Sequence, residues 1–130
     1  MSTSGARFAA SLVDLLAPLG AVSHRRFFGG QGIVCGGVQF AMIIDDVLYF
    51  RTDAALADTL RARGAQPFVY GTRKRDVTVS AYWSVPEEGL DEPELLLAWA
   101  RASLAVALQK QAAKAPARQR APRAAAKRKT

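Results

Sequence analysis

The sequence predicts an α+β fold, an antiparallel β-sheet of about five to six strands flanked by N-terminal, middle and C-terminal helices in the order α-β-β-β-α-β-β-α. Three observations lead to this expectation. Apolar residues recur with the helical period near both ends of the main body, short apolar or alternating runs lie between them, and a basic segment closes the chain. The chain has 130 residues, of which 50% are hydrophobic, which suits one packed domain and excludes a wholly disordered chain.

The N-terminal helix is predicted from an apolar stripe whose members recur at helical spacing. Ser4 is a candidate N-cap, and Pro18 with Gly20 is expected to end the helix. The stripe consists of Phe8, Leu12, Leu15, Leu16 and Leu19.

Four strand segments and two tight turns follow this helix. The strands are predicted at residues 22–28, 33–35, 38–44 and 47–51. Gly36 and Gly37 form a turn that requires positive φ angles, and Asp45 with Asp46 forms the next turn.

A short middle helix connects these strands to a second hairpin. Thr52 or Asp53 is expected to cap this helix, which carries Leu56 and Leu60 and ends at Gly64. The hairpin pairs residues 68–71 with residues 77–85 around a basic turn at residues 73–76. Its second strand alternates, with one packed face and one more polar face. The packed face is Val77, Val79, Ala81 and Trp83, and the polar face is Thr78, Ser80 and Tyr82.

The last helix has a recognisable start. Asp91 is the expected N-cap, Pro93 lies in the first turn, and Glu94 completes a capping box three residues after the cap. The face predicted to pack on the sheet contains Leu95, Trp99, Ala102 and Val106. We expect this helix to fray near residues 114–116.

The positive charge is concentrated at the C-terminus. The formal net charge is +7, whereas residues 1–109 carry ten basic and eleven acidic residues, a net of −1. The basic residues after position 109 are Lys110, Lys114, Arg118, Arg120, Arg123, Lys127, Arg128 and Lys129. We therefore predict a folded domain over residues 1–114 and a disordered basic tail over residues 115–130, which is the candidate nucleic-acid-binding segment.

The histidine, the cysteine and the glycine cluster are candidate catalytic or ligand-binding residues, but each is explained by a structural role. His24 is expected to be a half-exposed strand residue, and Cys35 a small buried hydrophobe, because no cation or helix N-terminus flanks it. The glycines of Gly30-x-Gly32 are expected to serve a turn and a bulge, since the chain continues as a strand and not as a helix. We therefore expect no catalytic residue, no metal site and no cofactor.

Targeting signals are also missing from the sequence. One cysteine suits a reducing compartment, residues 1–10 lack the features of a signal peptide, and no run reaches the roughly 18 apolar residues of a membrane span. The expectation is a soluble, cytoplasmic protein.

An ordered series of segments carries a family resemblance. These segments are RRFFGGQGI, GVQFAMIIDDVLYFRTD, QPFVYGTRKRDVTVSAYWSVPEE and DEPELLLAWARASLAVA. Together they resemble the N-terminal domain of the TfoX/Sxy family of competence regulators, over about residues 8–108. The resemblance implies an α+β domain, no catalytic residues, and a role as a transcriptional co-regulator acting with the cAMP receptor protein or polymerase. Where full-length family regulators carry a second, helical domain, this sequence has the basic tail.

Three functions follow as hypotheses. The first is a non-enzymatic regulatory or interaction domain with nonspecific DNA affinity through the tail. The second is an RNA-associated protein that uses the turn of Arg73, Lys74 and Arg75 with Tyr70 and Tyr82. The third is a small-molecule sensor or enzyme that uses residues 24–26 and the glycine turn.

The candidate partner-binding residues are Arg25, Arg26, Arg73, Lys74 and Arg75. Strand alternation predicts that Arg25 and Arg26 differ in role. One should face the helix-covered side and pair with a carboxylate such as Asp45 or Asp14, and the other should be exposed for a partner.

Overall fold

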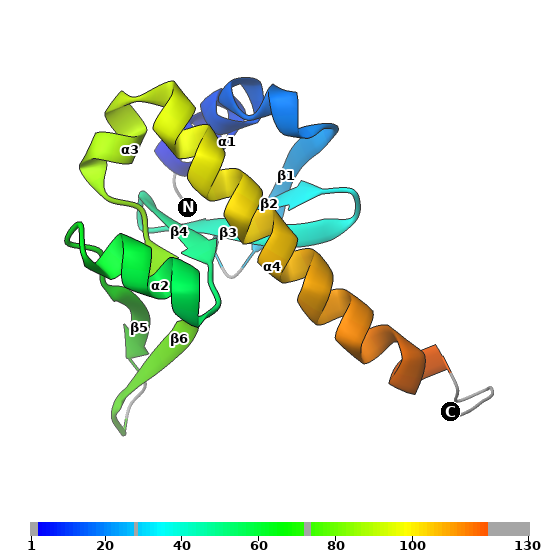
Figure 1. The fold of residues 1–130 in the computed structure, drawn as a ribbon. Coiled ribbons are helices and arrows are strands. Elements are labelled where there is room, and N and C mark those ends of the chain that lie inside the picture. The colour runs from blue at the N-terminus through cyan, green and yellow to red at the C-terminus, as the bar shows by residue number, and fades with distance from the viewer. Residues whose placement is uncertain (1–2, 28, 72–73, 120–130) are drawn as a thin grey trace.

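The computed structural model describes residues 3–27, 29–71 and 74–119, with side chains for residues 5–27, 29–71 and 74–112. The elements along the chain (Figure 1) are α1 (Thr3–Leu15), the 3₁₀ helix η1 (Ala17–Leu19), β1 (Val22–Phe27), β2 (Gly30–Cys35), β3 (Val38–Ile44), β4 (Val47–Arg51), α2 (Ala54–Arg61), β5 (Pro67–Gly71), β6 (Asp76–Ser84), α3 (Glu87–Asp91) and α4 (Pro93–Gln119). The predicted α+β class is confirmed, with helices at the start, in the middle and at the end.

The six strands form one antiparallel sheet in the order β1-β2-β3-β4-β6-β5. Four strands precede α2, as the four predicted strand segments require, which is one more than the three in the predicted order of elements. The two predicted turns are confirmed by their backbone. Gly36 and Gly37 have φ angles of 62° and 80°, and Asp45 and Asp46 have φ angles of 52° and 66°. Aspartate tolerates this left-handed conformation better than most residues.

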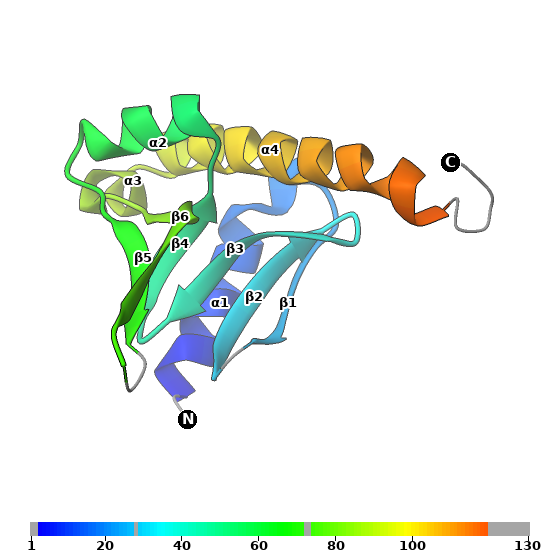
Figure 2. The same ribbon diagram turned by 90° about the horizontal axis from the view of Figure 1, so that it is seen from below.

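The helices pack on one face of the sheet and enclose the core there. The core joins α1 and α4 to the central strands, through buried side chains such as Leu12, Ile33, Phe40, Phe50 and Leu96. In Figure 2, β2 and β3 cross in front of α1, and α4 runs along the upper side. Among the described residues no helix covers the near face, which we call the open face.

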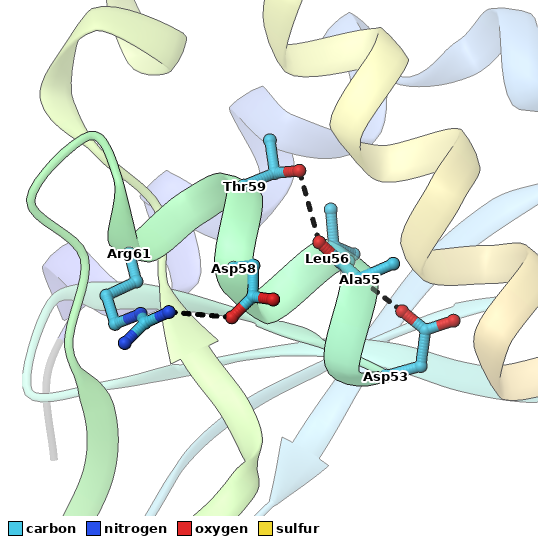
Figure 3. Close-up of polar contacts among 6 residues, drawn as sticks. All are labelled: Asp53, Ala55, Leu56, Asp58, Thr59 and Arg61. Atoms are coloured by element: carbon cyan, nitrogen blue, oxygen red, sulfur yellow. Dashed lines mark hydrogen bonds and ion pairs between the residues drawn. The ribbon is translucent and has the colours of Figure 1, made fainter.

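The middle helix follows the sequence prediction closely. Asp53 is the cap, and its Oδ1 accepts a hydrogen bond of 2.9 Å from the backbone N–H of Leu56. Arg61 pairs with Asp58 at 2.8 Å on the exposed side (Figure 3). Gly64, with φ of 98°, lies just beyond the helix as expected.

Both predicted caps of the long helices were wrong. Helix α1 begins at Thr3, so Ser4 lies inside the helix and not at its cap. Asp91 ends the additional helix α3, and Glu92 precedes α4, where its carbonyl accepts from the N–H of Leu96 at 3.0 Å. The physical reason for α3 is that acids at positions 87 and 88 favour the positive end of a helix directly after Pro86.

One glycine fixes how α3 lies on α4. A Cβ atom at Gly89 would approach the Trp99 ring to 2.3 Å, so only glycine permits this contact. The Arg63 guanidinium lies over the Trp99 ring, with its Cζ 5.5 Å from the ring centroid. Nη1 of Arg63 also pairs with Oε2 of Glu88 in α3 at 2.8 Å.

Helix α4 extends beyond the expected fraying region. It runs to Gln119, and its Ala, Gln and Lys residues after position 108 have high helix propensity. The division between a domain at residues 1–114 and a disordered tail at residues 115–130 stays a prediction, and residues 120–130 lie outside the described part of the chain. No helix within the described residues is both long enough and apolar enough to cross a membrane.

Candidate functional site

The open face of the sheet contains an apolar groove of about 490 Å³, which we call the groove. It is lined by Phe27, Met42, Ile44, Phe68, Tyr70, Val79 and Tyr82. These side chains come from β1, β3, β5 and β6, so the two edge strands of the sheet, β1 and β5, contribute to one hollow. The sheet must curve strongly for this to happen, as antiparallel sheets with bulges do.

Aromatic contacts hold one wall of the groove. The Phe68 ring packs edge-on against Tyr49 at a centroid distance of 5.0 Å and stacks with Tyr70 at 6.0 Å. Tyr70 is 48% exposed, whereas Phe68 and Tyr49 are half-buried. Burial, and secondarily the charge of Asp45, raises the pKa of Tyr49 above its ordinary value of 10.0.

A strand irregularity places β6 side chains differently from the prediction. Pro67 pairs with Trp83, but the next residue, Phe68, pairs with Val79. Alternation is broken between these pairs, so Val79 lines the groove together with Tyr82, while Trp83 packs against the core. The predicted alternation therefore holds for residues 77–81, where every second side chain is exposed, and is wrong at Tyr82 and Trp83.

Two arginines lie beside the groove. Arg25 is in register with Gly32, which is in register with the groove residue Met42, so all three share the open face. The Gln39 side chain crosses the space that a Gly32 side chain would fill, and its Oε1 accepts from Nη2 of Arg25 at 3.3 Å.

Arg51 lies beside the groove at the end of β4. Its guanidinium lies over the Tyr82 ring, 5.9 Å from the centroid. Its Nε–H is fully buried and makes no hydrogen bond. Its backbone carbonyl accepts from Ser103 on the opposite, helix-covered side.

Arg25 and Arg26 point to opposite sides of β1 as alternation predicts, because Arg25 lies on the open face and Arg26 lies near Gly5 of α1. The expected difference in burial is not observed, because both side chains are exposed. Strand β1 is the outermost strand and residues 23–26 are all exposed, so neither guanidinium requires a buried carboxylate such as Asp14. Arg26 and Asp45 line a second, polar hollow of about 370 Å³. That hollow also includes Gly5, Gly29, Gly30, Gln31, Ile43 and Asp46.

The third hypothesis placed a ligand at residues 24–26 and the glycine turn. The structure brings Arg26, Gly29 and Gly30 together in the polar hollow. His24, however, is exposed, and its Nδ1 lies 2.8 Å from Oε1 of Gln31. No group of three or more His, Cys, Asp or Glu side chains that could hold a metal occurs among the described residues.

The remaining predicted residues are accounted for as follows. Cys35 is buried as expected, with its Sγ 4.0 Å from the carbonyl oxygen of Leu19. Lys74 and Arg75 are exposed at the turn between β5 and β6, and Arg73 lies outside the described residues. Of the two tyrosines of the RNA hypothesis, Tyr70 is exposed and Tyr82 is half-buried under Arg51. Half-burial restricts access to one of the two tyrosine rings, and the RNA hypothesis itself stays a prediction.

The basic residues after position 109 fall in two groups. Lys110 is exposed on α4, and positions 114 and 118 follow on the same helix at spacings of four, which places them along one side of it. Arg120, Arg123, Lys127, Arg128 and Lys129 lie outside the described residues.

Sequence reasoning missed the groove, although one signal was present. Residues 38–44 are nearly all apolar, whereas a strand with one solvated face alternates. Only every second residue of a strand can face one core, so Met42 and Ile44 are apolar residues that the helix-covered face does not need. They indicated that the second face of the sheet is apolar as well.

The fold and the groove define a two-layer α+β domain with one helix-covered sheet face and one open apolar face. Residues 14–107 match the family model of the TfoX N-terminal domain. The chain belongs to this family, and the resemblance inferred from the sequence is confirmed. A comparison with curated proteins finds no match.

Proposed function

We propose that this chain is a non-enzymatic regulatory domain of the TfoX type that holds nucleic acid nonspecifically through its basic C-terminal segment. One observation carries the proposal. The core contacts of α4 end at Ala107, yet the helix continues to Gln119 and projects away from the sheet (Figure 1). From position 110 onward every charged residue is basic.

The charge distribution supports binding through this segment and not through the sheet. Residues 1–109 carry a net charge of −1, which gives no long-range attraction for phosphate. The eight cations after position 109 can neutralise several phosphates and release counterions. Such contacts follow the backbone of DNA and do not read base edges.

The test measures DNA affinity as a function of salt by fluorescence anisotropy, with two duplexes of unrelated sequence. The full chain should bind both with similar affinity, and the affinity should fall steeply with salt. Replacing the eight cations after position 109 by Gln should abolish most of this binding. The matched control, Arg25→Gln with Arg26→Gln, should leave it nearly unchanged. Selective binding of one duplex by the Gln-substituted chain would contradict the proposal.

The regulatory part of the proposal concerns a protein partner. Family resemblance suggests the cAMP receptor protein or polymerase, and the exposed cations Arg25, Lys74 and Arg75 are the side chains proposed to contact it. A pull-down with the purified candidates should recover one of them. Substitution of these three residues by Ala should weaken the recovery, whereas removal of residues 115–130 should not. Equal recovery with the triple variant would remove these residues from the interface.

A further inference from the structure

The groove has the dimensions and lining of a small-molecule site. Its volume of about 490 Å³ lies within the roughly 300–1,000 Å³ typical of such sites. Aliphatic and aromatic side chains form the lining, and the two tyrosine hydroxyls are its side-chain polar groups. A concave apolar surface of this kind gains free energy when an apolar body displaces its water.

The charged residues around the groove indicate which polar group a ligand with an apolar body would carry. Asp76, beside the β5–β6 turn, is the one acidic residue within the six strands, and Asp45, in the β3–β4 turn, is near enough for its charge to act on Tyr49. Two cations, Arg25 and Arg51, lie beside the groove on the open face. The Arg51 guanidinium is held against the groove residue Tyr82, and its buried Nε–H makes no hydrogen bond. A guanidinium that is partly removed from water and lacks a hydrogen-bond acceptor attracts an anionic group.

We propose that the groove binds a small apolar molecule that carries one carboxylate, such as a medium-chain fatty acid. The apolar body lies between Phe27 and Met42 on one side and Phe68 and Val79 on the other. The carboxylate lies at the Tyr82 end, next to the guanidinium of Arg51. This binding is independent of the basic C-terminal segment and of the function proposed for it.

Other occupants fit the groove less well. A nucleic-acid base requires hydrogen-bond partners for its edge, which this lining lacks apart from two hydroxyls. A second copy of the chain would bring Arg25 and Arg51 of each open face into one interface, where like charges repel each other. In a ligand with an apolar chain and one carboxylate, the chain contacts the apolar lining and the carboxylate pairs with the guanidinium.

The experiment compares decanoate with 1-decanol, which has the same alkyl chain without the charge. Binding to the full chain is measured by calorimetry below the concentration at which decanoate forms micelles. Decanoate should bind about tenfold more tightly than decanol, as expected for one charge-assisted contact. Arg51→Met should remove this preference and leave decanol binding unchanged. Arg25→Met is the matched control on the same face and should retain most of the preference.

A second pair of variants tests the position of the alkyl chain. Val79→Phe fills the groove and should abolish binding of both ligands, whereas Val69→Phe, at an exposed position on the same hairpin, should not. If Val79→Phe fails to fold, Tyr70→Ala provides the same test at an exposed groove residue. It should weaken the binding of both decanoate and decanol. Equal affinities for decanoate and decanol would overturn the proposal. So would a dimer that Tyr70→Ala dissociates in a chain that binds no decanoate, because the groove would then belong to a second copy.

Discussion

Ser103 connects the helix layer to the sheet, and its removal should have a measurable cost. The side chain is fully buried on α4, and its Oγ lies 2.8 Å from the carbonyl oxygens of both Phe40 and Arg51. A hydroxyl has one proton, so it donates to one of these carbonyls at a time. The contact fixes α4 on β3 and β4, directly behind the strand that presents Arg51 to the groove.

The expected effect of Ser103→Ala combines two opposing contributions. Leaving a buried carbonyl without its donor costs about 1–3 kcal/mol. The higher helix propensity of Ala offsets roughly 0.5 kcal/mol of this cost. The net loss of about 1–2 kcal/mol corresponds to a fall in Tm of about 4–8 °C for a domain of this size.

Thermal unfolding followed by circular dichroism measures this loss. Ser11→Ala is the matched control, because Ser11 is exposed on α1 and the substitution should leave Tm unchanged or slightly higher. A Tm for Ser103→Ala equal to that of the unsubstituted chain would refute the reasoning. It would show that these carbonyls need no donor from α4.

Three further outcomes test the fold. A chain that ends at Pro116 should keep its Tm, because the described core ends well before that residue, and a large fall would show that the tail docks on the domain. Asp53→Ala should lower stability by about 1 kcal/mol through loss of the cap on Leu56, measured by urea unfolding; Asp53→Asn should retain most of the stability, and equal losses in both would contradict a capping role. The raised pKa of Tyr49 means that the folded state favours the neutral phenol, so this stabilisation is complete below the ordinary pKa of 10.0 and is lost as pH rises through the folded pKa. The free energy of unfolding of the unsubstituted chain should therefore fall more steeply with pH in this range than that of Tyr49→Phe. Parallel curves for the two chains would contradict a raised pKa of Tyr49.

Local features of the sequence were sufficient for much of the fold. The strands at residues 38–44 and 47–51, the two turns with positive φ, and the cap at Asp53 follow from neighbouring residues alone. Each of these depends on interactions within a few positions, namely backbone sterics, side-chain caps and apolar alternation. The predicted cap of α4 failed because Asp91 belongs to the additional helix α3.

The sequence by itself determined the family, the α+β class, the buried state of Cys35 and the concentration of cations after position 109. The tertiary structure decided the groove and the exposure of both Arg25 and Arg26. Phe27 and Tyr70 are 43 positions apart in the sequence and lie on opposite edge strands, and they line one hollow because the sheet curves. The strands carry register shifts between Ile33 and Val34 and between Pro67 and Phe68, which are irregularities of the kind that bend strands. Such long-range pairing depends on how whole strands pack against each other, which no local pattern of residues specifies.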